Sequence, residues 1–244
     1  MAEHSPFGIR IPQRVNLQES SAYRDGLVEI QDEGSQLATL AAAGVGGAKI
    51  LDLCAGAGGK SLMLAMLAGP SARIIASDPD SGKLSELKKR ARRAGAVIEA
   101  IASKELSKRA DLRGKFDLVL VDAPCTGSGT IRRNPDVRWR VTDSTIARSV
   151  SLQRDILKSA VGWLAPGGSL VYVTCSIFPE ENEGQALWIS KNLHLSPEPI
   201  GESRGAFGDA IEEFITPEGF LRIDPSQGDW DGFFAASFSL RGEK

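Results

Sequence analysis

The chain has 244 residues, of which 42% are hydrophobic and 25% charged, a composition typical of a globular protein with one large core. The formal net charge is −2, so any contact with nucleic acid has to come from a local basic patch rather than from the surface as a whole. Three widely spaced cysteines and only two histidines argue against a disulfide scaffold and against a structural zinc site. No signal peptide or membrane-spanning run is recognisable, and we expect a cytoplasmic monomer that binds neither a metal nor a membrane.

The first part of the chain is weakly patterned. We expect residues 1–30 to form an extension or the remnant of a preceding domain, and residues 31–244 to form one domain. The alternation in Leu27–Gln31 predicts a short strand. Asp32 or Ser35 can cap a helix that runs to about Ala43.

An alternation of strands and helices then begins. Apolar runs predict strands at 49–53, 73–77, 97–102, 116–121 and 169–174, and periodic segments predict helices at 60–68, 80–94, 145–164 and 180–189. In the third of these helices we expect five buried side chains, those of Ile146, Leu152, Ile156, Leu157 and Val161. The tail holds hairpin-like pieces near Ile215, Leu221–Ile223 and Phe233–Leu240. This rhythm predicts an α/β fold with a mostly parallel sheet that is covered by helices on both faces.

A glycine-rich turn, Asp52-Leu53-Cys54-Ala55-Gly56-Ala57-Gly58-Gly59-Lys60, follows the first strand. Its glycine spacing fits neither a dinucleotide-binding fingerprint nor a phosphate-binding P-loop. Asp78 ends the second strand, where a carboxylate can accept hydrogen bonds from both hydroxyls of a ribose. These features favour an adenosyl ligand without a pyrophosphate, with S-adenosyl-L-methionine as the leading candidate. The alternative is an ordinary tight turn in which Asp78 caps a helix.

Reactive side chains follow two later strands. Asp122-Ala123-Pro124-Cys125-Thr126-Gly127-Ser128-Gly129-Thr130 comes after the fourth strand, and Cys175 closes the fifth. Because the carboxyl ends of parallel strands meet in one crevice, we expect the two sulfurs to lie within roughly 10 Å of each other. The alternative is that both are buried structural thiols, which is a common fate of free cysteine.

Two thiols and an acid suit the methylation of cytosine at carbon 5. A thiolate that adds to carbon 6 turns the ring into an enamine, which can attack an electrophilic methyl group. The carbon-5 proton and the thiol must then leave, which needs acid–base help. Asp122 can hydrogen-bond the ring nitrogen and the exocyclic amine, and so stabilise the charge that develops on addition.

These motifs, with Arg132-Arg133-Asn134-Pro135-Asp136 and Thr174-Cys175-Ser176-Ile177-Phe178-Pro179-Glu180-Glu181-Asn182-Glu183, resemble the RNA (cytosine-5)-methyltransferase family, most closely the bacterial 16S ribosomal RNA methyltransferase B branch. The resemblance extends from about Tyr23 to the C-terminus. It implies a Rossmann-like, S-adenosylmethionine-dependent methyltransferase fold with a seven-stranded sheet, and RNA, in particular ribosomal RNA, as the substrate. It also implies that Cys175 is the nucleophile and that Cys125 helps release the methylated base. The residues that it assigns to the cofactor are Cys54, Ala55, Gly56, Ala57, Gly58, Gly59, Lys60, Asp78, Ser103 and Asp122.

The sequence departs from this family in two places. Ser103 stands where the family usually carries an aspartate near the adenine end of the cofactor. The N-terminal RNA-binding domain of this branch is almost entirely missing. We therefore expect either a catalytic fragment or a short paralogue that receives its substrate differently.

A basic stretch after the first thiol is the candidate RNA contact. Arg132, Arg133 and Arg138 can hold phosphates, and Trp139 can stack on a base. The alternative is a solvated loop that Trp139 anchors.

Two other functions stay open at this point. A DNA cytosine methyltransferase would use the thiol after proline, Cys125, as its nucleophile and would leave Cys175 unexplained. A catalytically idle RNA-binding or assembly protein that retains the fold would account for Ser103 and for the missing domain.

Overall fold

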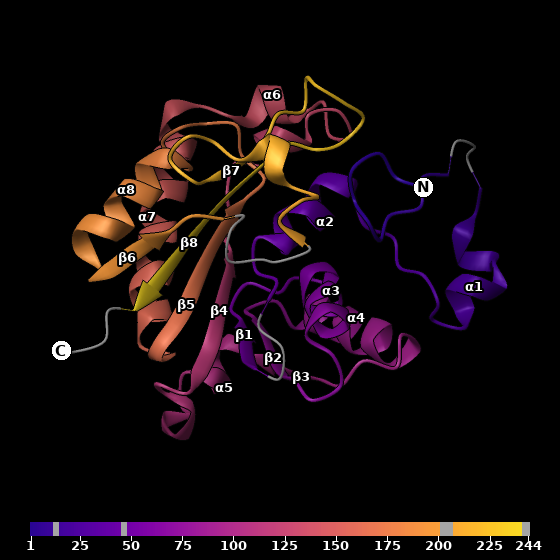
Figure 1. Ribbon diagram of the computed structural model, residues 1–244, viewed down its shortest axis with the longest axis horizontal. Coiled ribbons are helices and arrows are strands. Elements are labelled where there is room, and N and C mark those ends of the chain that lie inside the picture. The colour runs from indigo at the N-terminus through magenta and orange to yellow at the C-terminus, as the bar shows by residue number, and fades with distance from the viewer. Residues whose placement is uncertain (12–14, 45–47, 201–206, 241–244) are drawn as a thin grey trace.

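One mixed β-sheet forms the centre of the protein (Figure 1), in a computed structural model that describes residues 1–11, 15–44, 48–200 and 207–240. Its strands are β1 (Lys49–Asp52), β2 (Arg73–Asp78), β3 (Ile98–Ala102), β4 (Phe116–Asp122), β5 (Leu164–Thr174), β6 (Leu195–Glu198), β7 (Leu221–Ile223) and β8 (Phe233–Leu240). Seven of them lie in the order β3-β2-β1-β4-β5-β8-β6, and the short β7 pairs with β8 as an eighth strand, one more than the seven-stranded sheet expected. The strands from β3 to β5 in this order are parallel, and β8 runs antiparallel to β5.

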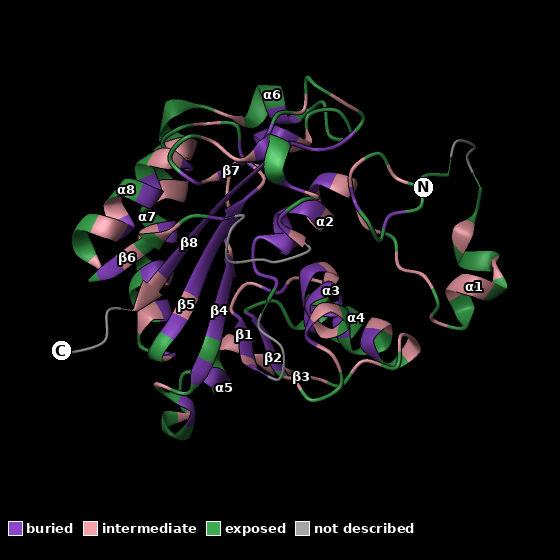
Figure 2. Cartoon of the chain, viewed as in Figure 1, coloured by how far each residue is buried: buried purple, intermediate pink, exposed green. Residues whose placement is uncertain are grey.

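Helices cover both faces of the sheet (Figure 1). The helices are α1 (Ser21–Arg24), α2 (Glu33–Leu40), α3 (Gly59–Ala68), α4 (Ser81–Arg93), α5 (Ser103–Leu106), α6 (Val137–Arg140), α7 (Asp143–Val161) and α8 (Glu183–Asn192). Helices α2, α3 and α4 pack on one face, and α5, α7 and α8 pack on the other. The central strands are buried along nearly their whole length (Figure 2), as expected for a sheet that is covered twice.

Side-chain caps fix where the helices begin. The Asp32 side chain accepts a hydrogen bond from the backbone N–H of Gly34 at the start of α2, and Asp80 accepts from two N–H groups at the start of α4. Thr142 and Thr145 form a reciprocal capping box at the start of α7. The sequence prediction placed two of these three starts within about one residue and began α7 two residues late.

The predicted strand at Leu27–Gln31 is wrong. This segment has no partner strand, and Leu27 and Ile30 are exposed. Two of its side chains are anchored: Glu29 accepts hydrogen bonds from Arg90 and Arg93 of α4, and Gln31 donates to the Ser35 hydroxyl at 3.1 Å. The alternation of polar and apolar residues therefore reflects an extended segment held by ion pairs rather than by a sheet.

The predicted helix at 145–164 ends earlier and buries less than expected. Helix α7 ends at Val161, and Leu164 already begins β5. Of the five side chains expected inside, only Leu157 is fully buried, and Leu152 is 49% exposed. Leu152 and Ile156 line a cavity, and Ile156 also packs against the core, which explains why neither side chain is fully buried. Strand β6, Leu195–Glu198, was not predicted; it contains a proline and lies at the edge of the sheet.

The first 30 residues contact the domain at several points. The Glu33 carboxylate accepts hydrogen bonds from the backbone N–H of His4 and Ser5, at 2.7 and 2.9 Å. The Arg93 guanidinium lies 3.7 Å from the centre of the Tyr23 ring. The boundary expected at residue 30 remains a prediction. Within the described part of the chain, no helix combines the length and apolar character that crossing a bilayer requires.

Candidate active site

The carboxyl ends of the parallel strands gather polar side chains at one edge of the sheet. Asp52 ends β1, Asp78 ends β2 and Asp122 ends β4, and Cys175 directly follows β5. In an open α/β sheet, ligands bind in the crevice at this edge, next to the point where the strand order reverses. Here the order reverses between β1 and β4.

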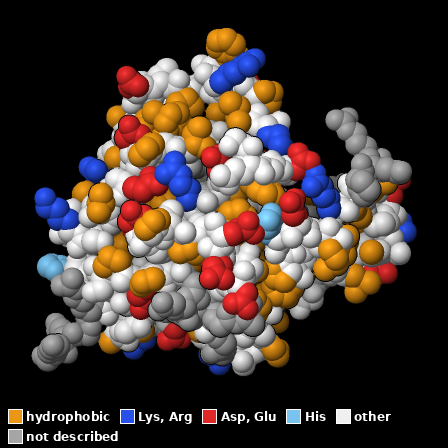
Figure 3. Space-filling model, turned by 45° about the horizontal axis from the view of Figure 1, so that its top comes forward, with side chains coloured by type: hydrophobic (Ala, Val, Ile, Leu, Met, Phe, Trp, Pro, Cys, Tyr) orange, Lys and Arg blue, Asp and Glu red, His pale blue; other side chains and the backbone are white. Residues whose placement is uncertain are grey.

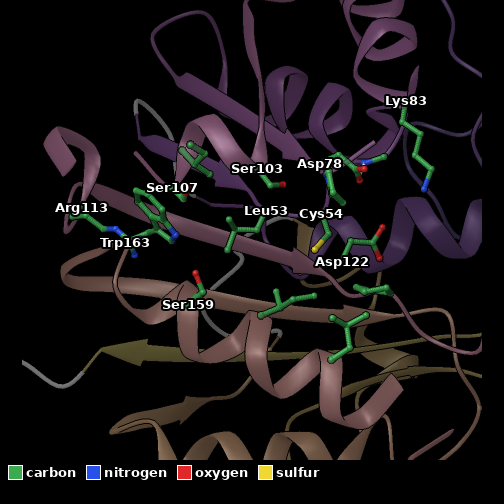
Figure 4. Close-up of a pocket in the computed structure, with 16 residues that line it drawn as sticks. Leu53, Cys54, Asp78, Lys83, Ser103, Ser107, Arg113, Asp122, Ser159 and Trp163 are labelled. Carbon is green, nitrogen blue, oxygen red and sulfur yellow. The ribbon is translucent and has the colours of Figure 1, made fainter. Parts of the chain in front are cut away.

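A cavity of about 620 Å³ opens at this edge (Figure 4). Of the residues assigned to the cofactor, those that line it are Cys54, Gly56, Asp78, Ser103 and Asp122. Ala55, Ala57, Gly58, Gly59 and Lys60 are not among its lining residues. Apolar side chains form much of the remaining wall, and at its far end the Arg113 guanidinium stacks 3.7 Å from the Trp163 ring centre. The volume and the mostly apolar wall fit an adenosyl ligand.

Gly56 and Gly58, both in the glycine-rich turn, have different structural roles. Gly56 has a φ of +54° and borders the cavity, and a Cβ added there would meet no atom within 4 Å. Gly58 has a φ of +87°, and its added Cβ would lie 2.6 Å from the Cγ of Leu87. Gly56 therefore leaves room for a ligand, whereas Gly58 allows the turn to pack against α4.

Asp78 holds the glycine turn and faces the cavity. Its Oδ2 accepts a hydrogen bond from the Gly56 N–H at 3.0 Å, and its Oδ1 accepts from the Asp80 N–H at 2.8 Å. The residue that caps α4 is Asp80, so the alternative of Asp78 as the helix cap is wrong. Ser103 begins α5, and its hydroxyl lies 3.2 Å from that of Ser77.

The two expected thiols meet. The Sγ atoms of Cys125 and Cys175 lie 3.4 Å apart, well within the predicted limit. The hydrogen bond from Cys125, together with the positive charge of Lys60, outweighs burial and lowers the pKa of Cys175. The same hydrogen bond and burial raise the pKa of Cys125. Cys175 is therefore the thiol of the pair that loses its proton more readily.

Cys54 differs from both. It lines the cavity, but burial and the negative charges of Asp52 and Asp122 raise the pKa of its thiol. A thiol kept protonated is a poor nucleophile. This agrees with the interpretation of Cys54 as a residue that contributes its backbone to the turn.

Lys60 links the glycine turn to the chemistry. Its Nζ lies 2.8 Å from Asp122 Oδ2 and 4.8 Å from the centre of the Phe233 ring, and the residue is only 7% exposed. Burial favours the neutral amine, but the charge of Asp122 outweighs this effect and the pKa of Lys60 is raised. Lys60 thus places a positive charge beside Asp122 that also acts on Cys175.

Sequence reasoning missed Glu181. Its carboxylate is fully buried and accepts hydrogen bonds from Thr126 and Ser176, the residues that follow the two thiols. The signal was present in the acidic run Glu180-Glu181-Asn182-Glu183, but a carboxylate whose partners are 55 and 5 residues away is not apparent from spacing. The described residues contain no cluster of three or more histidine, cysteine, aspartate or glutamate side chains that fits a metal ion.

The four residues expected to bind RNA fall into two pairs. Arg132 forms an ion pair with Asp32, and Arg133 forms one with the fully buried Asp231, so both arginines join this loop to distant parts of the chain. Arg138 instead stacks on Trp139, with 5.0 Å between the guanidinium and the ring centre, and Trp139 is 78% exposed. On the face shown in Figure 3, basic and acidic side chains are interspersed, and no broad basic patch appears.

Comparisons with known proteins extend these observations. A family model described as "16S rRNA methyltransferase RsmB/F" matches residues 40–239. A protein of Sodalis glossinidius (strain morsitans), named ribosomal RNA small subunit methyltransferase B, is 39% identical over 232 residues, which cover 95% of this chain and 51% of that protein. The chain thus spans about half the length of the curated relatives it matches.

Solved structures agree with the fold. The crystal structure of PH0851 is 34% identical, with a TM-score of 0.81 over 93% of this chain and 50% of the other. The structure of NSun6 from Pyrococcus horikoshii is 24% identical, with a TM-score of 0.78 over 94% of this chain and 57% of the other. At that level of identity, the second likeness supports the fold alone.

Proposed function

Because this chain belongs to the 16S rRNA methyltransferase RsmB/F family, we propose that it transfers a methyl group from S-adenosylmethionine to carbon 5 of a cytosine in ribosomal RNA. The observation that carries the proposal is the pair of sulfurs 3.4 Å apart, at the ends of the adjacent strands β4 and β5. Asp122 ends β4, three residues before Cys125, and lines the cavity. Two thiols and an acid beside an adenosyl-sized cavity suit a covalent route to carbon 5.

The first half of the reaction belongs to Cys175. Its thiolate attacks carbon 6 of the cytosine, a carbon–sulfur bond forms, and the electrons of the 5,6 double bond become available at carbon 5. Lys60 stabilises the thiolate before attack, and the Asp122 carboxylate accepts a hydrogen bond from the exocyclic amine of the base. When bound, S-adenosylmethionine would supply an electrophilic methyl group for carbon 5, and its positively charged sulfur would remain as a neutral thioether.

The second half restores the ring. A base removes the proton from carbon 5, the 5,6 double bond re-forms, and the Cys175 sulfur leaves as a thiolate. Cys125 is suited to assist this release because its sulfur lies in contact with the leaving sulfur. Its raised pKa keeps it protonated during the attack, so it does not compete with Cys175 for the base.

The target base has to leave its stack to reach sulfurs that are only partly exposed. The exposed Trp139 and the stacked Arg138 offer a platform for a neighbouring base and a charge for a phosphate. Arg132 and Arg133 contribute by fixing the loop from which these two residues project.

Transfer of a labelled methyl group from S-adenosylmethionine tests the proposal. The protein should label ribosomal RNA, and digestion of the product should yield 5-methylcytidine, while DNA stays unlabelled. Label in DNA alone would support a DNA cytosine methyltransferase. No label in either, from a protein that binds the cofactor, would support an idle RNA-binding or assembly protein.

A further inference from the structure

We propose that Glu181 is a positioning residue, whose buried carboxylate holds the two thiol-bearing loops in register so that Cys125 and Cys175 reach the same base. The inference rests on the proposed function, because it assigns a purpose to the closeness of the two sulfurs. Glu181 touches neither sulfur in the hydrogen-bond network. It acts through the residue that follows each cysteine.

Both loops are tied to the same carboxylate. Thr126, next to Cys125, donates its backbone N–H to Glu181 Oε1 at 3.0 Å and its hydroxyl to Oε2 at 2.5 Å. Ser176, next to Cys175, donates its hydroxyl to Oε2 at 2.6 Å. The two hydroxyls also lie 3.3 Å from each other. Hydrogen bonds to an ionised carboxylate are shorter and stronger than those between neutral groups, so this bridge fixes one loop against the other.

Further contacts fix Glu181 itself. Gln153 of α7 donates its side-chain amide to Glu181 Oε1 at 3.0 Å and to the Pro124 carbonyl at 3.1 Å. The Tyr172 hydroxyl of β5 donates to the Glu181 carbonyl at 2.6 Å. A fully buried carboxylate with partners from the β4 loop, β5 and α7 has one available orientation, which is the preorganisation that a two-thiol mechanism needs.

The neighbouring glutamates do not share this position. Glu180 is exposed, and Glu183 forms an ion pair with Arg222 on the surface. Among the three glutamates of this segment, Glu181 alone points between the thiol loops, so the arrangement is specific to one side chain.

The charge of Glu181 adds a second effect. It contributes to the raised pKa of Cys125, whose sulfur lies 3.4 Å from that of Cys175. The other charged or titratable groups that act on this pair are Lys60, Arg133, Asp122 and Tyr172, of which Lys60 and Arg133 favour the Cys175 thiolate. Glu181 thus helps decide which thiol is ionised as well as where each one lies.

Glu181→Gln tests this, with Glu198→Gln as the matched control. The variant keeps the shape of the side chain but replaces one accepting oxygen by an amide that cannot accept from Thr126 and Ser176. Glu198 accepts a serine hydroxyl from Ser169 at 3.3 Å in β6, at the far edge of the sheet, so its replacement controls for the substitution itself.

The first readout needs neither RNA nor methyl transfer. Alkylation of the full chain by iodoacetamide across a pH series, resolved by mass spectrometry, gives the rate at each thiol. In the parent and in Glu198→Gln, Cys175 should react well below the pH at which Cys125 reacts. In Glu181→Gln, the preference for Cys175 near neutral pH should fall by about tenfold, the change that one pKa unit produces in the thiolate population. An unchanged preference would overturn the inference.

The second readout is turnover. Glu181→Gln should lower kcat by about tenfold or more while leaving the KM for S-adenosylmethionine near that of the parent, because the cofactor cavity does not include Glu181. An equal fall of kcat in Glu198→Gln, or an unchanged kcat in Glu181→Gln, would contradict the positioning role of Glu181.

If Glu181→Gln does not fold, Thr126→Val offers a milder change, because it removes one hydroxyl donor only. It should reduce the preference for Cys175 in the same direction but by less, and no reduction would also overturn the positioning role. A parent protein that methylates nothing but keeps the Glu181-dependent thiol preference would refute the proposed function and leave the positioning role standing.

Discussion

Asp52→Asn should make the protein more stable at high pH and should leave its stability at low pH nearly unchanged. The Asp52 side chain ends β1 and is 1% exposed. Its Oδ2 accepts a hydrogen bond from the Ser61 hydroxyl at 2.6 Å, while Oδ1 has no hydrogen-bond partner. Asparagine keeps the shape and the Ser61 contact and removes the charge.

The size of the effect follows from the pKa. Burial raises the pKa of Asp52 from 3.8 to about 7, although the Ser61 hydrogen bond opposes the rise. The folded state therefore binds a proton that the unfolded state has already lost, and the free energy of unfolding falls as the pH rises from 3.8 through about 7. At about 1.4 kcal/mol per pH unit, the full loss above neutral pH is on the order of 4 kcal/mol. Between about pH 5.5 and pH 8 it amounts to roughly 2 kcal/mol.

Urea unfolding of the parent and the variant at several pH values measures this difference. The advantage of Asp52→Asn should grow by roughly 2 kcal/mol from about pH 5.5 to pH 8 and then level off. Asp155→Asn, which changes a surface aspartate paired with Lys158, is the control and should give a curve parallel to the parent. Parallel curves for Asp52→Asn and the parent would refute the idea that Asp52 is held protonated by burial.

Three further predictions concern binding. Asp78→Ala should weaken the binding of S-adenosylmethionine, measured by calorimetry, by about 1.5–3 kcal/mol, the range for hydrogen bonds to a charged group. An unchanged affinity would show that Asp78 does not bind the cofactor. Trp139→Ala should weaken RNA binding by about 1–3 kcal/mol, because a stacking contact is lost. Arg138→Ala should make the slope of log affinity against log salt concentration shallower by roughly one. An unchanged slope would show that Arg138 contacts solvent and not a phosphate. Gly56→Ala and Gly58→Ala should both lower the melting temperature, because both backbones have a positive φ, but Gly58→Ala should lower it more, because only its Cβ would overlap the Leu87 side chain. Gly56→Ala should also weaken cofactor binding, because Gly56 borders the cavity. Equal losses of stability would contradict the roles given to these glycines.

The sequence predicted correctly those elements whose structure depends mainly on their own residues. The apolar runs Phe116–Val121 and Arg73–Ser77 became buried strands, because a sheet covered on both faces needs such runs whatever lies next to them. Leu27–Gln31 has the alternation of a strand but no neighbouring strand edge, and pairing cannot be seen in a single segment. Leu152 has the spacing of a core residue but faces the cavity, and the position of a cavity depends on how helices and strands assemble.

In the candidate site, too, the sequence predicted some features, whereas others depend on how distant segments assemble. The meeting of Cys125 and Cys175 was predictable, because both follow parallel strands and such strands end at one edge. The ion pairs of Arg132 with Asp32 and of Arg133 with Asp231 were not, since they join residues about a hundred positions apart in the chain. Glu181 was hidden for the same reason. A motif reveals which side chains are present, but only the fold reveals which of them are already paired.

The most direct measurement is the covalent complex between the protein and RNA on denaturing electrophoresis, in the presence of S-adenosylmethionine. Cys125→Ala should attack and methylate but fail to release the base, so a complex that survives denaturation should accumulate. Cys175→Ala should form no complex and transfer no methyl group. A complex formed by Cys175→Ala and missing in Cys125→Ala would give the nucleophile's role to Cys125, and no complex from either variant would contradict the covalent route altogether.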